Sequence, residues 1–392
     1  MALNSQHILI VGAGIAGLAA ARALALRGAT VTVLEQAPAI TEVGAGLQVS
    51  PNGMAVLKSL GLAQALLDTG APRARALLLH DHAGRRLGRF PQTRLARGDD
   101  YLLVHRADLI EVLAQGARDA GVDIQLGQTV QQVTPGAAPT VTLTDGTSRQ
   151  ADLIIGADGL HSPTARAVVT RDQPFFTGQI AWRAVIPGDN SPHEVELYMA
   201  PGRHLVTYPL RGGTLRNIVA VEERQSWAEE SWSTSDDPRN VQQAFAGMGA
   251  RPRALLDQID KVNIWGLFRH PVADRWHAPG VALLGDAVHP TLPFLAQGAC
   301  MGLEDAWVLA DQLDRHQDQG QALAAYQSLR HARVTRVVDA ASRNARHFHL
   351  SGVMAFGAGM GIRMLGLVMP GYAARSFAWV YEHDVTGGVS LI

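Results

Sequence analysis

The chain is poor in the residues that mark secreted, metal-binding or nucleic-acid-binding proteins. Cys300 is the single cysteine, so an intrachain disulfide and a thiolate metal cluster are both excluded. The net charge is −1, which gives no electrostatic case for a nucleic-acid partner. Lysine occurs only at Lys58 and Lys261, and we attribute this to genome base composition. The N-terminus lacks the features of a signal peptide, so a reducing cytoplasm is the expected location. No metal site is expected.

Long apolar runs are scarce, with one exception at residues 352–370. This stretch is apolar except for Arg363. A membrane span needs about 20 apolar residues, but the many glycines, the central arginine and the closing proline favour a buried or interfacial helix. Hydrophobic residues make up 47% of the 392 residues and charged residues 18%. The chain can therefore bury a large core, in two or three domains or in one elaborated α/β domain.

The N-terminal residues have the pattern of a βαβ unit. The apolar run at residues 7–11, HILIV, predicts a buried strand, and residues 15–27 are rich in alanine and leucine, as a helix would be. Residues 30–35, TVTVLE, alternate and are β-branched, so they predict a second strand. Between the first strand and the helix lies a glycine turn.

The middle of the chain changes character. Several strand-like runs between residues 175 and 224 are separated by proline and glycine, which predicts an antiparallel sheet inserted into the α/β domain. Residues 226–260 are expected to be helical, and residues 306–345 mostly helical. We therefore predict four segments: a first part of a dinucleotide-binding domain (1–174), an inserted β-sheet domain (175–265), the second part of the first domain (266–345) and a C-terminal helical segment (346–392).

The glycine turn reads GxGxxG. Gly12 permits the tight turn, Gly14 lets a pyrophosphate approach the backbone, and Gly17 lets the helix pack closely on the strand. Ala16 lies at the helix start, whose free N–H groups and dipole attract phosphate. Glu35 ends the second strand, where an acid accepts hydrogen bonds from the adenosine ribose. The motif predicts a bound dinucleotide but does not by itself separate FAD from NAD.

Two further stretches resemble a known family. Residues 157–162 read ADGLHS and residues 285–298 read GDAVHPTLPFLAQG. Together with the glycine motif, in this order and at these spacings, they resemble the flavin-dependent aromatic hydroxylases, the single-component FAD monooxygenases of the p-hydroxybenzoate hydroxylase type. The likeness covers nearly the whole chain. It implies a Rossmann-like α/β FAD-binding domain with an inserted antiparallel β-sheet substrate domain and C-terminal helices.

The resemblance also implies where FAD binds. Asp286 would reach the ribityl chain, and Arg106, at a helix start, would touch the phosphate or ribose. Gly298 and Ala299 would offer backbone N–H groups to the pyrimidine edge of the ring. Pro293 belongs to an uncharged loop that would lie beside the ring and shield a reactive oxygen adduct from water.

Two more residues are assigned to the cofactor in the same way. Asp158 would lie near the pyrophosphate, with water between the like charges. Gln48 belongs to the loop 44–52, GAGLQVSPN, which in relatives runs along the isoalloxazine ring. The co-substrate would be NADH or NADPH, and the sequence does not decide between them.

The substrate would bind in the inserted sheet. His204 and Tyr208 are four residues apart, so along a strand both lie on one face. The pattern HxVxYPxRGG, with AQGA downstream, looks most like the salicylate hydroxylase and 3-hydroxybenzoate 6-hydroxylase branch. There the matching histidine and tyrosine assist phenol deprotonation, and Gln297 would join them at the ring. Three arginines are candidates to bind a substrate carboxylate: Arg183, Arg203 and Arg211.

The resemblance thus implies a monooxygenase that uses NAD(P)H and O2 to hydroxylate a phenolic aromatic acid through a flavin C4a-hydroperoxide. A quinone precursor, or an N-heteroaromatic acid such as a hydroxynicotinate, is the alternative substrate. A flavoprotein that carries electrons without hydroxylating, and a plain NAD-dependent dehydrogenase, are rival classes. The dehydrogenase has no use for a second acid at Asp286. The sequence decides neither the exact substrate and position nor the oligomeric state, and a homodimer is left open.

Overall fold

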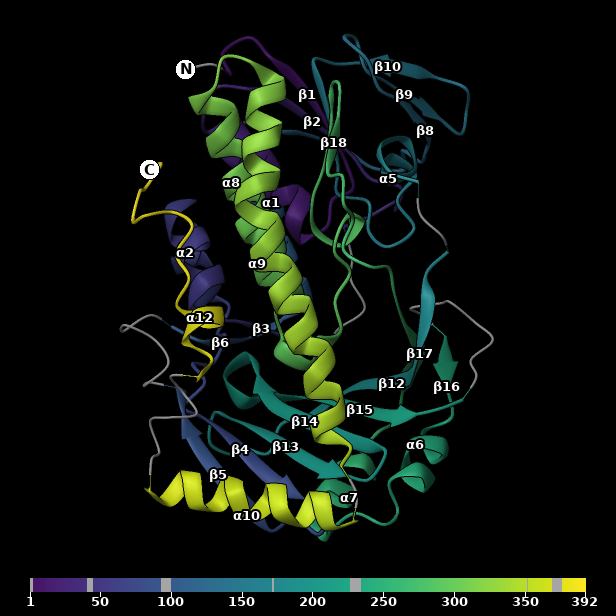
Figure 1. Ribbon diagram of the computed structural model, residues 1–392, viewed down its shortest axis with the longest axis vertical. Helices are drawn as coiled ribbons and strands as arrows, with labels where there is room; N and C mark the ends of the chain where they lie inside the picture. The colour runs from purple at the N-terminus through teal and green to yellow at the C-terminus, as the bar shows by residue number, and fades with distance from the viewer. Residues whose placement is uncertain are drawn as a thin grey trace.

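The computed structural model describes residues 3–40, 45–92, 100–170, 173–225, 234–350, 352–368 and 376–392. The two largest sheets lie toward opposite ends of the long axis of the molecule (Figure 1). Part of the loop predicted at 44–52, part of the helical region predicted at 226–260 and the end of the run at 352–370 fall outside these residues.

The first sheet has six strands in the order β18-β19-β11-β1-β2-β7. All neighbours are parallel except the edge pair β18 and β19. Helices cover both faces of such a sheet, so its central strands β19, β11 and β1 are nearly uniform apolar runs. The strands are β1 (His7–Val11), β2 (Thr30–Leu34), β7 (Asp123–Gln125), β11 (Leu153–Gly156), β18 (His277–Ala278) and β19 (Val281–Leu283).

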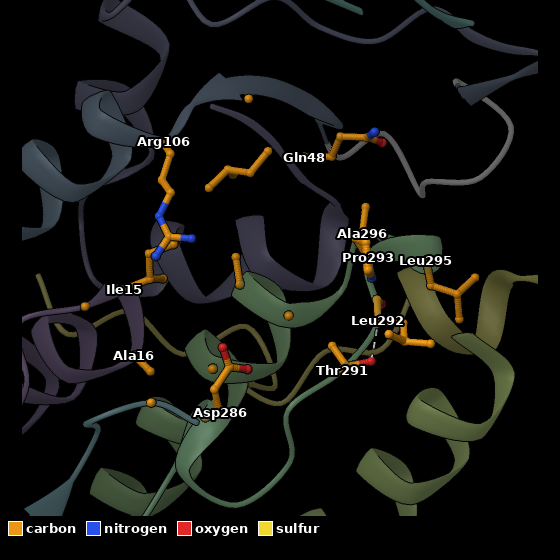
Figure 2. A pocket seen from close by; sticks show the side chains of 18 of the residues that line it. Ile15, Ala16, Gln48, Arg106, Asp286, Thr291, Leu292, Pro293, Leu295 and Ala296 are labelled. Carbon is orange, nitrogen blue, oxygen red and sulfur yellow. Dashed lines mark hydrogen bonds between the residues drawn. The ribbon is translucent and has the colours of Figure 1, made fainter. Parts of the chain in front are cut away.

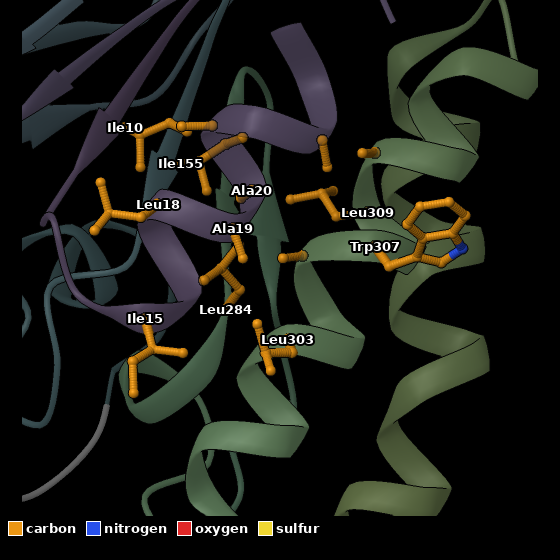
Figure 3. Packing of buried hydrophobic residues seen from close by; sticks show 14 of the residues in the cluster. Ile10, Ile15, Leu18, Ala19, Ala20, Ile155, Leu284, Leu303, Trp307 and Leu309 are labelled. Atoms are coloured by element: carbon orange, nitrogen blue, oxygen red, sulfur yellow. The ribbon is translucent and has the colours of Figure 1, made fainter. Parts of the chain in front are cut away.

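The helices around this sheet form the main core. Helix α1 (Ile15–Ala25) packs between the sheet and α8 (Gly298–Arg315), and its small alanines allow the close approach (Figure 3). A Cβ built on Gly302 would lie 3.0 Å from Cβ of Ala16. The other helices of this part are α2 (Pro51–Ser59), α3 (Ala63–Asp68), α4 (Arg106–Asp119), α5 (Pro163–Val168) and α9 (Gln319–Phe348).

Two small sheets accompany the six-stranded one. A three-stranded sheet has the order β10-β9-β8, and a two-stranded sheet joins β3 to β6. The β3–β6 pair carries the start of α4 directly after β6, so it brings that helix start close to the strand that contains Gln48. The strands are β3 (Gly46–Val49), β6 (Leu102–His105), β8 (Val130–Thr134), β9 (Thr140–Leu143) and β10 (Ser148–Gln150).

The second large sheet has eight strands in the order β16-β17-β12-β15-β14-β13-β4-β5. Every neighbouring pair is antiparallel except β13 and β4. This confirms the predicted fold class, an α/β domain with an antiparallel sheet. The strands are β4 (Ala76–Asp81), β5 (Arg86–Pro91), β12 (Phe175–Pro187), β13 (Glu194–Ala200), β14 (Arg203–Leu210), β15 (Leu215–Glu223), β16 (Ser235–Asp236) and β17 (Val262–Arg269).

The eight-stranded sheet is wider than the inserted segment expected at residues 175–265. Its edge hairpin, β4 and β5, comes from residues 76–91, which the sequence assigned to the dinucleotide-binding part. Strand β4 joins the sheet by pairing in parallel with β13, over 100 residues later in the chain. Strand pairing at such a separation leaves no local pattern, so the sequence did not reveal it.

Three of the remaining described helices lie around the second sheet, and the last one contacts α2. Helices α6 (Pro238–Ala244) and α7 (Ala250–Leu256) cover one face and bury a cluster that includes Trp182 and Phe245. Helix α10 (Gly352–Val368) lies beside β5 at the end of the molecule, and α12 (Ala378–Tyr381) follows it in the chain (Figure 1). Among the described residues, no helix combines the length and apolar character needed to cross a membrane.

Candidate active site

A cavity of about 600 Å³ extends from the glycine turn to the eight-stranded sheet. This volume falls within the range of small-molecule sites, roughly 300–1,000 Å³. Figure 2 shows Arg106 and Asp286 facing the same space, with Ala16 on one side and the turn that contains Pro293 on the other. The cavity is lined by most of the predicted site residues: Gly12, Gly14, Ala16, Glu35, Gln48, Arg106, Asp158, His204, Tyr208, Asp286, Pro293, Gly298 and Ala299.

The glycine turn has the geometry that a phosphate needs. Gly12 has φ +102°, and a Cβ there would lie 2.5 Å from the Ala157 carbonyl oxygen. A Cβ on Gly17 would lie 2.1 Å from the Gly12 carbonyl oxygen, so this glycine keeps α1 close to β1 and does not itself line the cavity. A Cβ on Gly14 would meet no heavy atom within 4 Å, because Gly14 faces the cavity. The backbone here leaves room for a pyrophosphate.

The acid at the end of the second strand is oriented by the backbone. Glu35 Oε2 accepts a hydrogen bond from the Ala13 N–H at 2.7 Å, and Oε1 accepts one from the Ala37 N–H at 2.8 Å. A carboxylate has about four acceptor positions. Glu35 therefore retains acceptor capacity toward the cavity, where a ribose hydroxyl would donate.

Asp286 is the exception in a buried run. Residues 281–285 and 287–290 are buried, but Asp286 is open to the cavity. The surrounding protein raises its pKa by burial, and the nearby charges of His289 and Arg106 act in the opposite direction. No described residue donates a hydrogen bond to its carboxylate. A sugar hydroxyl would satisfy such a carboxylate.

The turn before Asp286 is held by a buried ionic network that the sequence did not reveal. The Gly285 N–H donates to Asp305 Oδ2 at 3.1 Å, and His289 Nε2 bonds to the same oxygen. Arg330 Nε donates to Asp305 Oδ1 at 2.8 Å. Burial raises the pKa of Asp305, but His289 and Arg330 lower it to about 2. The Asp305 carboxylate therefore holds the turn in place through its hydrogen bonds to Gly285 and His289.

Asp158 stabilises its own turn as well as lining the cavity. Its carboxylate accepts from the Ser162 hydroxyl, and from the N–H and hydroxyl of Thr164 at 3.0 and 2.7 Å. Burial raises its pKa, and these hydrogen bonds act against that rise. These contacts hold the start of α5 in place, and its expected water-mediated role at the pyrophosphate stays a prediction.

Helix α8 begins at Gly298 and points its N-terminus into the cavity. The first N–H groups of a helix have no partner within it. Gly298 and Ala299 therefore lie where their backbone N–H groups could donate to the pyrimidine edge of a flavin ring. The preceding turn, Pro293–Leu295, ends at Ala296 with φ 53°, which redirects the chain into the helix.

Gln297 does not lie where the sequence placed it. Its side chain is buried outside the cavity. Its Nε2 donates to Ser50 Oγ at 2.9 Å, and its Oε1 accepts from Asn52 Nδ2 at 2.9 Å. The tight start of α8 turns the amide toward α2. The structure therefore does not bring Gln297 together with His204 and Tyr208, because buried polar partners on α2 capture it.

His204 and Tyr208 both lie on β14 and both line the cavity. Both are buried. Burial, followed by the nearby His349, holds the pKa of His204 well below its ordinary value. His204 Nδ1 bonds to His349 Nε2 at 2.7 Å, so Nε2 is the ring nitrogen that remains for a substrate.

Several cavity residues escaped the sequence reasoning. Tyr101 lines the cavity, and its hydroxyl donates to Gln48 Oε1 at 2.7 Å. Tyr381 packs edge-on against Tyr101 with ring centroids 5.8 Å apart. Trp265 lines the cavity beside Arg183. Tyr101 directly precedes β6, Tyr381 ends α12 and Trp265 lies in β17. No short motif connects these three residues.

Comparison with known proteins identifies the family. Residues 5–341 match the FAD binding domain family, and the chain belongs to it. A 3-amino-4-hydroxybenzoate 2-monooxygenase from Streptomyces cremeus is 38% identical over 354 residues, which is 88% of each chain. A 3-hydroxybenzoate 6-hydroxylase from Aquipseudomonas alcaligenes is 33% identical over 394 residues, 97% of this chain and 98% of the other. The crystal structure of Klebsiella pneumoniae HpxO complexed with FAD and uric acid is 26% identical, with a TM-score of 0.84 over 96% of this chain and 98% of that one.

These findings confirm the predicted family and the predicted cofactor. The chain is an FAD-dependent flavoprotein monooxygenase of the aromatic hydroxylase type, with NADH or NADPH as electron donor. The residues fit the group: the open backbone at Gly14, the oriented Glu35 and the carboxylate of Asp286 all face one cavity. When bound, FAD takes electrons from the nicotinamide and uses O2 to supply one oxygen atom to the substrate.

Proposed function

We propose that the enzyme hydroxylates a phenolic aromatic acid of the hydroxybenzoate type. One observation carries the proposal: a single cavity connects the FAD end, at Gly14 and Asp286, with His204, Tyr208 and Arg183 on the antiparallel sheet. A ring placed between the two ends would lie beside the uncharged turn at Pro293. The two relatives named above act on hydroxybenzoates, which supports this substrate class.

His204 is the proposed base for the phenol. A phenolate is more electron-rich than a phenol and reacts faster with an electrophilic oxygen. A neutral histidine accepts a proton, and the lowered pKa of His204 favours that neutral form. Burial raises the pKa of Tyr208, so this side chain stays protonated and orients the substrate oxygen as a donor.

Arg183 is the proposed partner of the substrate carboxylate. Its guanidinium lies 4.5 Å from the Trp265 ring centroid, and the residue lines the cavity. The two other candidate arginines do not line the cavity: Arg203 pairs with Glu222 at 3.4 Å and Arg211 with Asp108 at 2.6 Å. A planar guanidinium in a cavity suits a carboxylate, because it can form two parallel hydrogen bonds.

A substrate screen tests the proposal. Purified holoenzyme is mixed with NADH or NADPH, and candidate rings are scored for faster nicotinamide oxidation and for the hydroxylated product. The set contains hydroxybenzoates, aminohydroxybenzoates, a hydroxynicotinate and a neutral prenylated phenol that represents a quinone precursor. We expect hydroxybenzoates to give coupled product. Product from the prenylated phenol alone would contradict the aromatic-acid assignment.

The cytoplasmic location and a homodimer are proposals as well. The sequence favours the first and leaves the second open. Fractionation of cells would test the first, and the mass of the holoenzyme by light scattering would test the second.

A further inference from the structure

Three side chains form a continuous hydrogen-bonded row that leads from the cavity to the molecular surface. His204 Nδ1 lies 2.7 Å from His349 Nε2, and His349 Nδ1 lies 2.7 Å from Glu223 Oε1. The row joins residues far apart in the chain: β14, the segment just after α9, and the end of β15. Neither His349 nor Glu223 lines the cavity, so neither can touch a substrate directly.

Only the outer end of this row is exposed to solvent. His204 is 1% exposed, the side chain of His349 is 2% exposed, and that of Glu223 is 52% exposed. The His204 ring is also enclosed by the edges of Phe294 and Phe348, each with its centroid 5.2 Å away. Apolar rings on these sides keep water from the His204 imidazole, so the row is a defined polar path from it to solvent.

The hydrogen-bond roles along the row follow from Glu223. A carboxylate accepts and cannot donate, so the His349 Nδ1–H donates to it. A neutral His349 then has an unprotonated Nε2, which accepts from the Nδ1–H of His204. A neutral His204 in that tautomer carries its lone pair on Nε2, the nitrogen that remains for the cavity. The surface carboxylate thus sets the buried base in its accepting form, as a partner on the other ring nitrogen does for any histidine.

We propose that His349 and Glu223 form a proton relay that prepares His204 as the base and carries the substrate proton to solvent. The relay rests on the proposed function. When His204 Nε2 takes the phenol proton, its Nδ1 proton passes to His349 Nε2, and the His349 Nδ1 proton passes to Glu223 and then to water. One proton enters the row and one leaves it, and no redox change occurs. The reverse transfers restore the starting tautomers when the product phenol is reprotonated.

Burial and the charges around the row disfavour a lasting positive charge on His204 or His349. Burial lowers the pKa of His349, Glu223 acts to raise it, and Arg203 acts to lower it. Arg203 itself pairs with Glu222. A cation on His204 or His349 is therefore disfavoured by burial, whereas the half-exposed Glu223 can exchange a proton with water. His349 and Glu223 are positioning residues that act through His204.

The tautomers can be measured without any turnover. Holoenzyme labelled with 15N-histidine is studied by long-range 15N–1H NMR without substrate, with His204 and His349 assigned from His204→Gln and His349→Gln variants. We expect both residues to be neutral with the proton on Nδ1. A His204 ring protonated on Nε2 would overturn the relay, whatever substrate the enzyme uses.

The transfer itself is tested with a matched pair of variants. Glu223→Gln keeps an acceptor for His349 but cannot take up a proton, while Glu222→Gln changes the neighbouring acid, which pairs with Arg203 and Arg224. A positioned base raises the rate of a reaction by about 10²–10⁴-fold. We expect the loss of Glu223 as proton acceptor to lower kcat roughly tenfold, with KM within about twofold of the wild-type value. External imidazole should restore part of the loss, and Glu222→Gln should behave as the wild type.

The outcomes separate the relay from the proposed function. Wild-type turnover by Glu223→Gln, or an equal loss in Glu222→Gln without imidazole rescue, would refute the relay while hydroxylation stands. If no phenolic acid is turned over by the wild type, the proposed function fails, and the NMR tautomers still decide whether the row is set as described.

Discussion

Two glycines of the turn between β1 and α1 should respond in opposite ways to the same added methyl group. Gly17→Ala would place a Cβ 2.1 Å from the Gly12 carbonyl oxygen, where real contacts stay above 3.0 Å. Helix α1 would have to move about 1 Å away from β1, and overpacking of this kind costs about 1–3 kcal/mol of unfolding free energy. We therefore expect the apoprotein itself to lose stability.

Gly14→Ala should leave the apoprotein nearly unchanged. The added Cβ meets no heavy atom within 4 Å, since it points into the cavity. That space is where the pyrophosphate of FAD must approach the backbone. We expect the affinity for FAD to fall at least tenfold, which corresponds to about 1.4 kcal/mol.

The assay compares the two variants with the wild type after removal of FAD. Urea midpoints of the apoproteins report stability, and titration with FAD, followed by flavin fluorescence, reports Kd. Gly17→Ala should lower the midpoint, and Gly14→Ala should raise Kd at an unchanged midpoint. The reasoning is refuted if Gly14→Ala binds FAD as tightly as the wild type, or if Gly17→Ala unfolds at the wild-type midpoint.

Three further predictions concern the substrate end and its surroundings. Arg183→Gln should raise KM at least tenfold for a carboxylate substrate but not for its neutral analogue, whereas Arg211→Gln should change neither KM. Equal steady-state effects of the two substitutions would contradict the proposed contact between Arg183 and the substrate carboxylate. Burial lowers the pKa of His204, so below about pH 6.5 the unfolded chain binds a proton at this residue that the folded chain does not bind. The free energy of unfolding should therefore decrease as the pH is lowered. His204→Gln should make that fall shallower by up to about 1.4 kcal/mol per pH unit, measured by urea unfolding between pH 7 and 5; parallel curves would disprove the assignment. Gln297→Leu, which removes one of the two acceptors of Asn52 Nδ2 and the donor to Ser50 Oγ, should cost about 1–3 kcal/mol of stability with little change in substrate KM; the reverse pattern in unfolding and kinetics would place Gln297 at the ring.

Motifs carried by neighbouring residues were predicted well. The strand, glycine turn and helix at residues 7–27 are read from spacing, because each depends on contacts within a few residues. The glycine motif, the ADGLHS stretch and the GDAVHP stretch together led to the family, and the structure places Gly14 and Asp286 at one cavity. Parallel strands end at one sheet edge, so acids that follow them converge there.

Side-chain direction was the main difficulty at the site. The same AQG stretch that marks the family contains Gln297, whose amide turns away to Ser50, 247 residues earlier in the chain. Spacing along β14 correctly put His204 and Tyr208 on one face. It held no information on which ring nitrogen of His204 would face the cavity.

By itself, the sequence determined the class of fold and the dinucleotide turn, since these follow from local backbone preferences and short spacings. It determined the flavin family through the resemblance that its three motifs carry. Only the tertiary structure decided that β4 and β5 widen the second sheet, that Arg183 rather than Arg211 reaches the cavity, and that His349 lies against His204 from 145 residues away. These outcomes depend on how distant elements pack, and buried polar groups take whichever partner that packing brings within reach.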